Sequence, residues 1–240
     1  MNALGLSNVG PIFRRELRSY FNSPVAYVVI IVFLSIIGWF FTSNLFLMNV
    51  ATLRIVFELV PLVFLFFVPA ITMRLLAEEM KSGTLELLTT KPVRDIEIVL
   101  GKFFAAWTLL AAALAPTLIY AISVGLLGSL DLGPVFTGYI GLLLMGGVYI
   151  AIGLFASSLT ENQIVAFIIS FLIILTLFLL DKVLIYVPEA FASTMEFLAI
   201  DYHFSNIARG VIDSRNVIYF GSLLGFSLYL ATVSLERRKW

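Results

Sequence analysis

Six long apolar stretches dominate this sequence and limit what the chain can fold into. A hydrocarbon core about 30 Å thick is crossed by about 20 apolar residues in a helix. Within a bilayer, backbone polar groups have to be satisfied inside the segment, so such stretches predict helices. The six expected spans are residues 25–47, 55–76, 103–127, 135–157, 164–180 and 217–235. The sequence therefore predicts an all-α integral membrane fold that forms one domain over residues 1–240.

The composition excludes several classes of function. Hydrophobic residues make up 61% and charged residues 12%, with a mean hydropathy of +1.05, whereas a water-soluble domain carries about 25% charged residues. The absence of cysteine rules out disulfides, thiol nucleophiles and cysteine metal ligands. A formal net charge of +0 provides no basic surface for nucleic acid. The first apolar stretch lacks a small-residue cleavage site behind it, which predicts a retained span.

The distribution of lysine and arginine predicts the orientation. Six spans place both termini on one side of the membrane, and cytoplasmic segments carry the excess of Lys and Arg. The side of the termini holds Arg14, Arg15, Arg18, Arg74, Lys81, Lys91, Arg94, Lys102, Arg237, Arg238 and Lys239. The opposite loops hold only Arg54, Lys182, Arg209 and Arg215. Both termini are therefore predicted to be cytoplasmic.

The connection between spans two and three, residues 78–97, is the densest block of charge. Its central part, Ser82–Thr90, predicts a short, capped, rigid helix that ends before Pro92, because the residue before proline avoids the helical region. Leu85 and Leu88 share a face of this helix. The residues expected to contact a soluble partner are Glu79, Ser82, Gly83, Thr84, Leu85, Glu86, Leu88 and Pro92. The alternative is a solvated loop that only sets the topology.

Residues 11–22 predict an amphipathic helix, opened by Pro11 and stopped before Pro24. At 100° per residue its apolar and basic side chains separate onto two faces. The apolar face holds Phe13, Leu17, Tyr20 and Phe21, and the basic face holds Arg14, Arg15 and Arg18. The pattern indicates an interfacial helix on the cytoplasmic leaflet and membrane lipid as a contact. The alternative is the ordinary flanking charge of a first span.

The long outer loop, residues 181–216, contains two pieces that are too short and too polar to span, yet apolar enough to enter the membrane surface. These pieces, residues 188–198 and 201–213, predict short re-entrant or interfacial helices at the outer surface. The residues expected to matter there are Phe197, Tyr202, His203, Phe204, Arg209 and Asp213. An ordinary packed outer loop is the alternative.

The sequence shows no catalytic or nucleotide-binding constellation. The single histidine, His203, has no companion for a metal site or a serine dyad. A Walker A loop is absent, because Gly101-Lys102 is followed by Phe103. The chain is therefore expected to be non-catalytic and to bind neither metal nor cofactor.

Charged residues inside spans would indicate ion coupling. Only Glu58 and Arg74 lie within the predicted spans, each near enough to an end to reach water. Glu78 and Glu79 are interpreted as a solvated face beside the bilayer. The prolines expected to kink spans are Pro61, Pro69 and Pro116. Gly221 and Gly225 form a G-x-x-x-G pattern, which marks either a helix–helix interface or a common neutral occurrence.

The order of elements and the charged block together resemble a known family. Residues 78–92 read E-E-x-x-x-G-T-L-E-L-L-x-T-x-P. With the amphipathic helix, six spans and outer segment, this block resembles permease subunits of the ABC-2 type exporter family. Within that family, residues 21–27 and 204–213 are most similar to gliding-motility-associated and copper-enzyme-maturation permeases.

The resemblance implies an assembly in a bacterial cytoplasmic (inner) membrane. Two permease subunits would pair, and they would be identical or different, with or without an extracytoplasmic domain on the second. Each would rest a coupling helix in a groove of a separate ATP-binding cassette ATPase. ATP and Mg would be bound by that ATPase, whose closure tilts the spans. The work done would be export or force transmission to partners outside.

Two other functions are compatible with the sequence. One is a membrane anchor or force-transmitting subunit through which no substrate passes. The other is an ion-coupled carrier, which would transport alone under a gradient. Copurification of an ATP-hydrolysing subunit distinguishes the ion-coupled carrier from both ATPase-driven functions.

Overall fold

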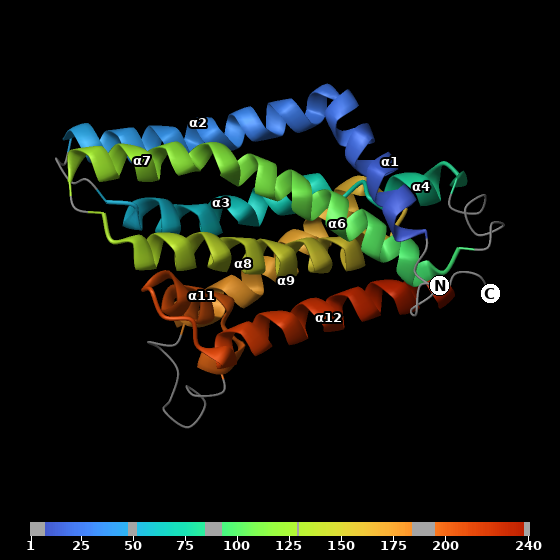
Figure 1. Ribbon diagram of the computed structural model, residues 1–240. Coiled ribbons are helices and arrows are strands. Elements are labelled where there is room, and N and C mark those ends of the chain that lie inside the picture. Colours follow the sequence, from blue (N-terminus) through green and yellow to red (C-terminus); the bar gives the residue numbers. More distant parts are fainter. Residues whose placement is uncertain (1–7, 48–51, 85–92, 129, 184–194, 238–240) are drawn as a thin grey trace.

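Six helices that are long and apolar enough to cross a membrane run between the two ends of the molecule (Figure 1). The structure, a computed structural model, describes residues 8–47, 52–84, 93–128, 130–183 and 195–237. The candidate spans are Pro24–Leu47, Arg54–Lys81, Asp95–Leu127, Leu132–Ser158, Gln163–Val183 and Ser214–Arg237. Each overlaps a predicted stretch, and the described residues contain no strand. The predicted all-α fold with six spans is therefore confirmed.

The helices follow one another along the chain with short connections. The described elements are α1 (Val9–Asn22), α2 (Pro24–Leu47), α3 (Arg54–Thr72), α4 (Ala77–Lys81), α6 (Asp95–Leu114), the 3₁₀ turn η1 (Ala115–Thr117), α7 (Leu118–Leu127), α8 (Leu132–Ser158), α9 (Gln163–Val183), α11 (Ile200–Ala208) and α12 (Ser214–Arg237). α3 and α4 together form the second span, and α6, η1 and α7 form the third.

α8 lies at the centre of the bundle, in contact with α3, α6, α9, α11 and α12. Its most apolar stretch is 78% buried, against 22% for α2 and for α9. Glycines allow this close packing: Gly146 lies against Leu110 and Phe64, and Gly153 lies against Thr72. A Cβ atom at either glycine would overlap those side chains, so the helices approach as they do because no side chain is present.

The third span differs from its predicted start at residue 103, because α6 begins at Asp95. Asp95, Glu97 and Lys102 are buried in this helix. Hydropathy places such residues outside a span, whereas here Glu97 and Lys102 find polar partners on α1 and α4. Within the span, the 3₁₀ turn η1 separates α6 from α7 and contains Pro116, one of the prolines expected to kink a span. Pro61 and Pro69 lie within a continuous α3.

The even number of spans brings both ends of the chain to the same end of the bundle. Figure 1 shows α1, α4, the start of α6 and the end of α12 there, and α11 at the opposite end. We call these the terminal end and the far end. α1 joins α2 through an elbow at Ser23 and crosses α6, where Ile12 is buried against Gly101.

Candidate functional site

Only the two flanks of the predicted coupling segment lie within the described residues. α4 and the turn after it cover residues 77–84, and residues 93–97 comprise the approach to α6 and its first turn. Outside the described residues lie Leu85, Glu86, Leu88 and Pro92. The helix predicted over Ser82–Thr90, and its leucine face, therefore stay predictions.

Gly83 sets the turn that follows α4. Its φ of 69° lies in the left-handed region that favours glycine. The hydroxyl oxygens of Ser82 and Thr84 lie 2.9 Å apart, and both hydroxyls donate to the Glu79 carbonyl at 3.3 Å. Among the described residues these hydroxyls bind the end of α4, and the predicted cap of a helix that follows lies outside the described residues.

Ser157 of α8 holds the break between α3 and α4. Its Oγ accepts hydrogen bonds from the backbone N–H groups of Leu76 and Ala77, each at 3.0 Å, and donates to the carbonyl of Met73 at 3.0 Å. The side chain is fully buried. One hydroxyl thus satisfies three backbone groups that the helix break would otherwise leave unpaired.

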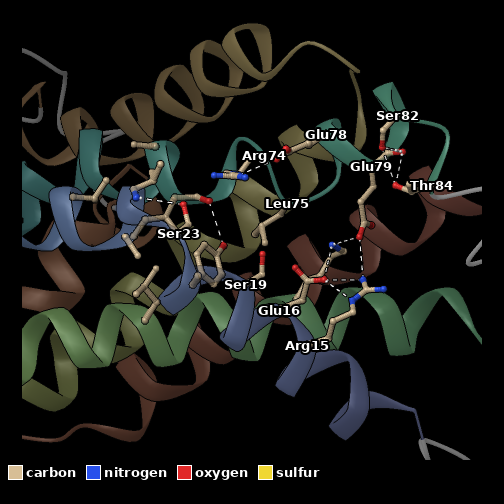
Figure 2. A pocket seen from close by; sticks show the side chains of 18 residues that line it. Arg15, Glu16, Ser19, Ser23, Arg74, Leu75, Glu78, Glu79, Ser82 and Thr84 are labelled. Atoms are coloured by element: carbon tan, nitrogen blue, oxygen red, sulfur yellow. Dashed lines mark hydrogen bonds and ion pairs between the residues drawn. The ribbon is translucent and has the colours of Figure 1, made fainter.

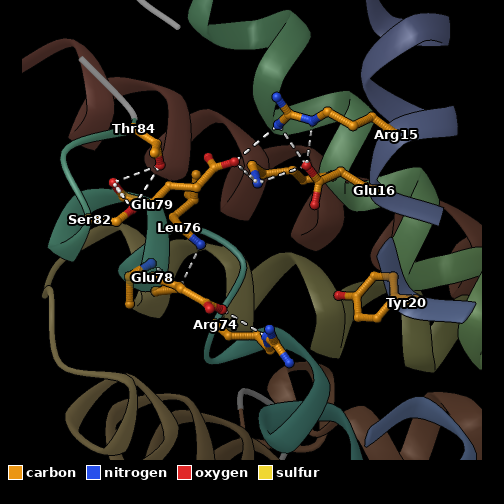
Figure 3. A network of polar contacts seen from close by, with 12 residues as sticks. Arg15, Glu16, Tyr20, Arg74, Leu76, Glu78, Glu79, Ser82 and Thr84 are labelled. Carbon is orange, nitrogen blue, oxygen red and sulfur yellow. Dashed lines mark hydrogen bonds and ion pairs between the residues drawn. The ribbon is translucent and has the colours of Figure 1, made fainter. Parts of the chain in front are cut away.

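Four charged side chains from α1, α4 and α6 form one cluster (Figure 3). Arg15 Nη2 lies 2.7 Å from Glu16 Oε1 and 3.0 Å from Glu79 Oε1. Lys102 Nζ lies 3.4 Å from Glu16 Oε1 and 3.0 Å from Glu79 Oε1. We call these residues the charge cluster. Two cations share the same two carboxylate oxygens, so the cluster ties three helices together at one point.

The burial of Lys102 makes both carboxylates necessary. Its side chain is 1% exposed, and an ammonium left unpaired in such a site carries a large desolvation penalty. Partial burial alone would lower the pKa of the Arg15 guanidinium, but hydrogen bonds and charges of Glu16 and Glu79 outweigh burial and raise that pKa. Arg15 therefore stays protonated in the cluster.

A second tie joins α1 to the other flank of the coupling segment. Glu97 Oε1 accepts from the Asn8 backbone N–H at 3.0 Å, and Glu97 Oε2 accepts from Asn8 Nδ2 at 3.0 Å. The same Oε2 accepts from the Arg94 backbone N–H at 2.9 Å, which caps α6. Both flanks of the predicted coupling segment are thus bound to α1.

α1 is amphipathic as predicted, but one of its faces rests on protein. Ile12, Glu16 and Tyr20 point to the bundle, and the Tyr20 hydroxyl donates to the Ile71 carbonyl at 3.4 Å. Burial raises the pKa of that hydroxyl. Of the predicted residues, Phe13 and Leu17 are half-buried, whereas Arg14, Arg18 and Phe21 are exposed. The predicted basic face is divided, because Arg15 turns into the charge cluster.

The two neighbouring glutamates, Glu78 and Glu79, also differ in exposure and in their partners. Glu78 is 47% exposed and pairs with Arg74 at 2.9 Å, in agreement with a solvated face. Glu79 is only 17% exposed and lies in the charge cluster, so for this residue that interpretation is wrong. At the far end, Glu58 pairs with Arg54 at 2.7 Å on the surface, as expected for a side chain that reaches water.

A cavity of 570 Å³ lies beside the charge cluster (Figure 2). It is bounded by α1, the elbow into α2, the ends of α3 and α4, and α6. Its polar wall includes Arg15, Glu16, Arg74, Glu78, Glu79, Ser82, Thr84 and Lys102. Its apolar wall includes Val25, Ala26, Val29, Ala70, Ile71, Leu75 and Leu109.

At the far end, His203 anchors the outer segment to the bundle. The ring stacks on Tyr219 with centroids 3.9 Å apart, and its nitrogens lie 2.8 Å from Asn216 Oδ1 and 3.0 Å from the Phe197 carbonyl oxygen. Phe204 packs against Gly141 of α8. These contacts hold α11 against the spans at the far end, and α11 itself does not span the bundle.

Of the other predicted residues of this segment, Phe197 and Tyr202 contact the His203 ring. Tyr202 is half-buried, Phe197 and Arg209 are exposed, and Asp213 Oδ1 accepts from the Arg215 backbone N–H at the start of α12. A second cavity, of 1230 Å³, lies between α3, α8, α9 and α11. Lys182 and Asp201, 2.6 Å apart, form an ion pair in its wall.

The sequence analysis missed Glu16, Lys102 and Ser157 as structural contacts at the terminal end. Glu16 stands among arginines, and its spacing of four from Ile12 and from Tyr20 was a detectable signal. Lys102 and Ser157 gave no local signal, because their partners lie on other helices. Gly221 and Gly225 meet nothing within 4 Å of an added Cβ, so their pattern faces outward from the described residues.

Comparison with known proteins is informative at the level of the family. The family model described as ABC-2 family transporter protein matches residues 14–209, which include the later part of α1, the charge cluster and α11. No curated protein matches the chain.

Proposed function

Because the chain belongs to the ABC-2 transporter family, we propose that it is the permease subunit through which a separate cytoplasmic ATPase drives export across a bacterial inner membrane. The chain is a multi-pass membrane protein of a family of transport components. ATP and Mg would be bound by the ATPase, and this chain would transmit the movement.

The observation that carries the proposal is the double attachment of the charged segment. One flank is held to α1 through Glu79 and Arg15, and the other through Glu97 and Asn8. A push on residues 85–92 would therefore reach α1 at two points and would reach α8 through Ser157. Such fixed attachments are expected of a segment that transmits displacement. They are not required of a loop that only sets the topology.

The test is the pair of leucines on the predicted coupling face. Leu85→Ala with Leu88→Ala should abolish copurification of the ATPase or uncouple ATP hydrolysis from function, because a buried anchor typically contributes about 2 kcal/mol or more to an interface. Glu86→Ala should be milder, since a charge at an interface rim contributes less. Membrane insertion, measured by membrane fractionation, is the control and should be unchanged.

Full assembly and full activity of the double leucine variant would refute the coupling role. A second candidate, force transmission without passage, shares this contact and is distinguished by transport itself. Failure of the reconstituted complex, a permease pair with its ATPase, to move any tested lipid, polysaccharide, drug or peptide would favour transmission. The narrower similarity to gliding-motility permeases stays a prediction.

A further inference from the structure

The cavity at the terminal end has the two-part lining of a site for an amphiphile. Apolar residues of α2 and α3, among them Val25, Val29 and Ile71, line one part. Charged residues of α1, the α3–α4 connection, α4 and α6 line the other. The cavity borders the first turn of α2, the start of the first candidate span. Lipid headgroups lie at the ends of such spans in a bilayer.

One carboxylate oxygen in the polar part has no partner among the described residues. Glu79 Oε1 takes both cations of the charge cluster, whereas Glu79 Oε2 is buried and makes no hydrogen bond there. A buried carboxylate oxygen without a donor is costly. The oxygen therefore calls for a ligand that brings N–H groups and a positive charge.

The opposite side of the polar part can hold an anion. The Arg74 guanidinium lines the cavity, and its Nε donates to Glu78 at 2.9 Å. A guanidinium has five N–H donors in a planar fork, so this bond leaves donors that suit a phosphate. Three cationic and three anionic residues line the cavity, Arg15, Arg74 and Lys102 against Glu16, Glu78 and Glu79. A neutral zwitterion matches this balance better than an anionic lipid.

We propose that this cavity binds a phospholipid with a primary amine headgroup, of the phosphatidylethanolamine class. A rotation of the Glu79 side chain brings Oε2, which is buried without a hydrogen-bond partner among the described residues, to the cavity and lets it accept from the ammonium. The phosphate accepts from Arg74, and an acyl chain lies along the apolar wall and the exposed apolar side chains of α2. A volume of 570 Å³ is within the range of about 300–1,000 Å³ for small-molecule sites. The lipid would bridge α1 and α4, the elements that the charge cluster joins.

The test measures lipid retention by the full chain, purified in detergent with the subunits that accompany it, using native mass spectrometry. Phosphatidylethanolamine should be retained in preference to phosphatidylcholine, whose quaternary ammonium has no N–H, and to phosphatidylglycerol, which has no cation. Glu79→Gln should lower retention of phosphatidylethanolamine about tenfold, the equivalent of one charge-assisted hydrogen bond, and leave phosphatidylcholine unchanged. Arg74→Gln should lower retention of both. Glu236→Gln, an exposed carboxylate at the same end, is the matched control and should change neither.

Two results would overturn the proposal. Equal retention of the three lipids by the unaltered chain would show that no headgroup site exists, and this comparison needs no variant to fold. Displacement of the lipid by soluble glycerophosphoethanolamine at equal concentration would assign the site to a water-soluble ligand. A soluble competitor that fails to displace phosphatidylethanolamine supports a membrane-derived occupant.

Discussion

At the residue scale, a few polar side chains decide how the terminal end is built. Ser157 hydrogen-bonds the backbone at the break between α3 and α4, and Lys102 pairs with carboxylates from α1 and α4. Both lie on central helices and are buried. A buried polar group without a partner is costly, so the groups that bind Ser157 and Lys102 would be destabilised if either side chain were removed.

Ser157→Ala is expected to destabilise the fold by about 1–3 kcal/mol, since three buried backbone groups lose their partner. Ser158→Ala is the matched control, because among the described residues the Ser158 hydroxyl bonds only the Phe155 carbonyl of its own helix, at 2.6 Å. Thermal unfolding in detergent should show a lower midpoint for Ser157→Ala than for Ser158→Ala. Equal midpoints would mean that the break is held by other contacts.

The residues that sequence reasoning found and missed differ in the range of their interactions. The spans were predictable because hydropathy is local, and α1 was predictable because its prolines and its periodicity are local. The start of α6 was missed because Glu97 and Lys102 look like loop residues until their partners on α1 and α4 are known. The buried face of α1 was missed for the same reason, since Gly101 receives Ile12 from a distant part of the chain.

At the scale of elements, α8 organises the bundle by offering glycine surfaces to its neighbours. The side chains of α3 and α6 reach its backbone at Gly153 and Gly146. Membrane helices associate mainly through such close packing, since lipid supplies no hydrophobic drive between them. The geometry of α3, and hence of α4 beyond it, therefore depends on these contacts.

Gly153→Ala should separate α3 from α8, because the new methyl group would overlap the side chain of Thr72. Overpacking of this kind costs about 1–3 kcal/mol. Gly221→Ala meets nothing within 4 Å, and alanine is the better helix former by about 1 kcal/mol, so this control should be neutral or stabilising. The measurement is the yield of monodisperse protein after heating. Similar losses for both variants would contradict the assigned packing.

At the scale of the whole molecule, the six spans fix which connections share a side. The connection between α8 and α9 falls on the side of the termini, and the connection between α7 and α8 falls on the other. The lysine and arginine distribution predicts that the side of the termini is cytoplasmic.

The chain has no cysteine, so single-cysteine variants can be labelled without background. Ser129→Cys and Ser193→Cys should react with an impermeant maleimide in intact cells. Thr160→Cys, between α8 and α9, should react only after permeabilisation. The reverse pattern would invert the orientation and would remove the charged segment from the reach of a cytoplasmic ATPase.

The start of α1 and the end of α12 lie at the same end of the bundle as α4 (Figure 1), and this has a consequence for how tightly a soluble partner has to bind. A domain tethered to either terminus by a short flexible linker would meet α4 at an effective concentration in the mM range. At about 1 mM, a contact with a dissociation constant of about 100 µM is about nine-tenths occupied. A covalently attached ATPase could therefore use an intrinsically weak contact, whereas a free subunit at micromolar concentration needs a tighter one.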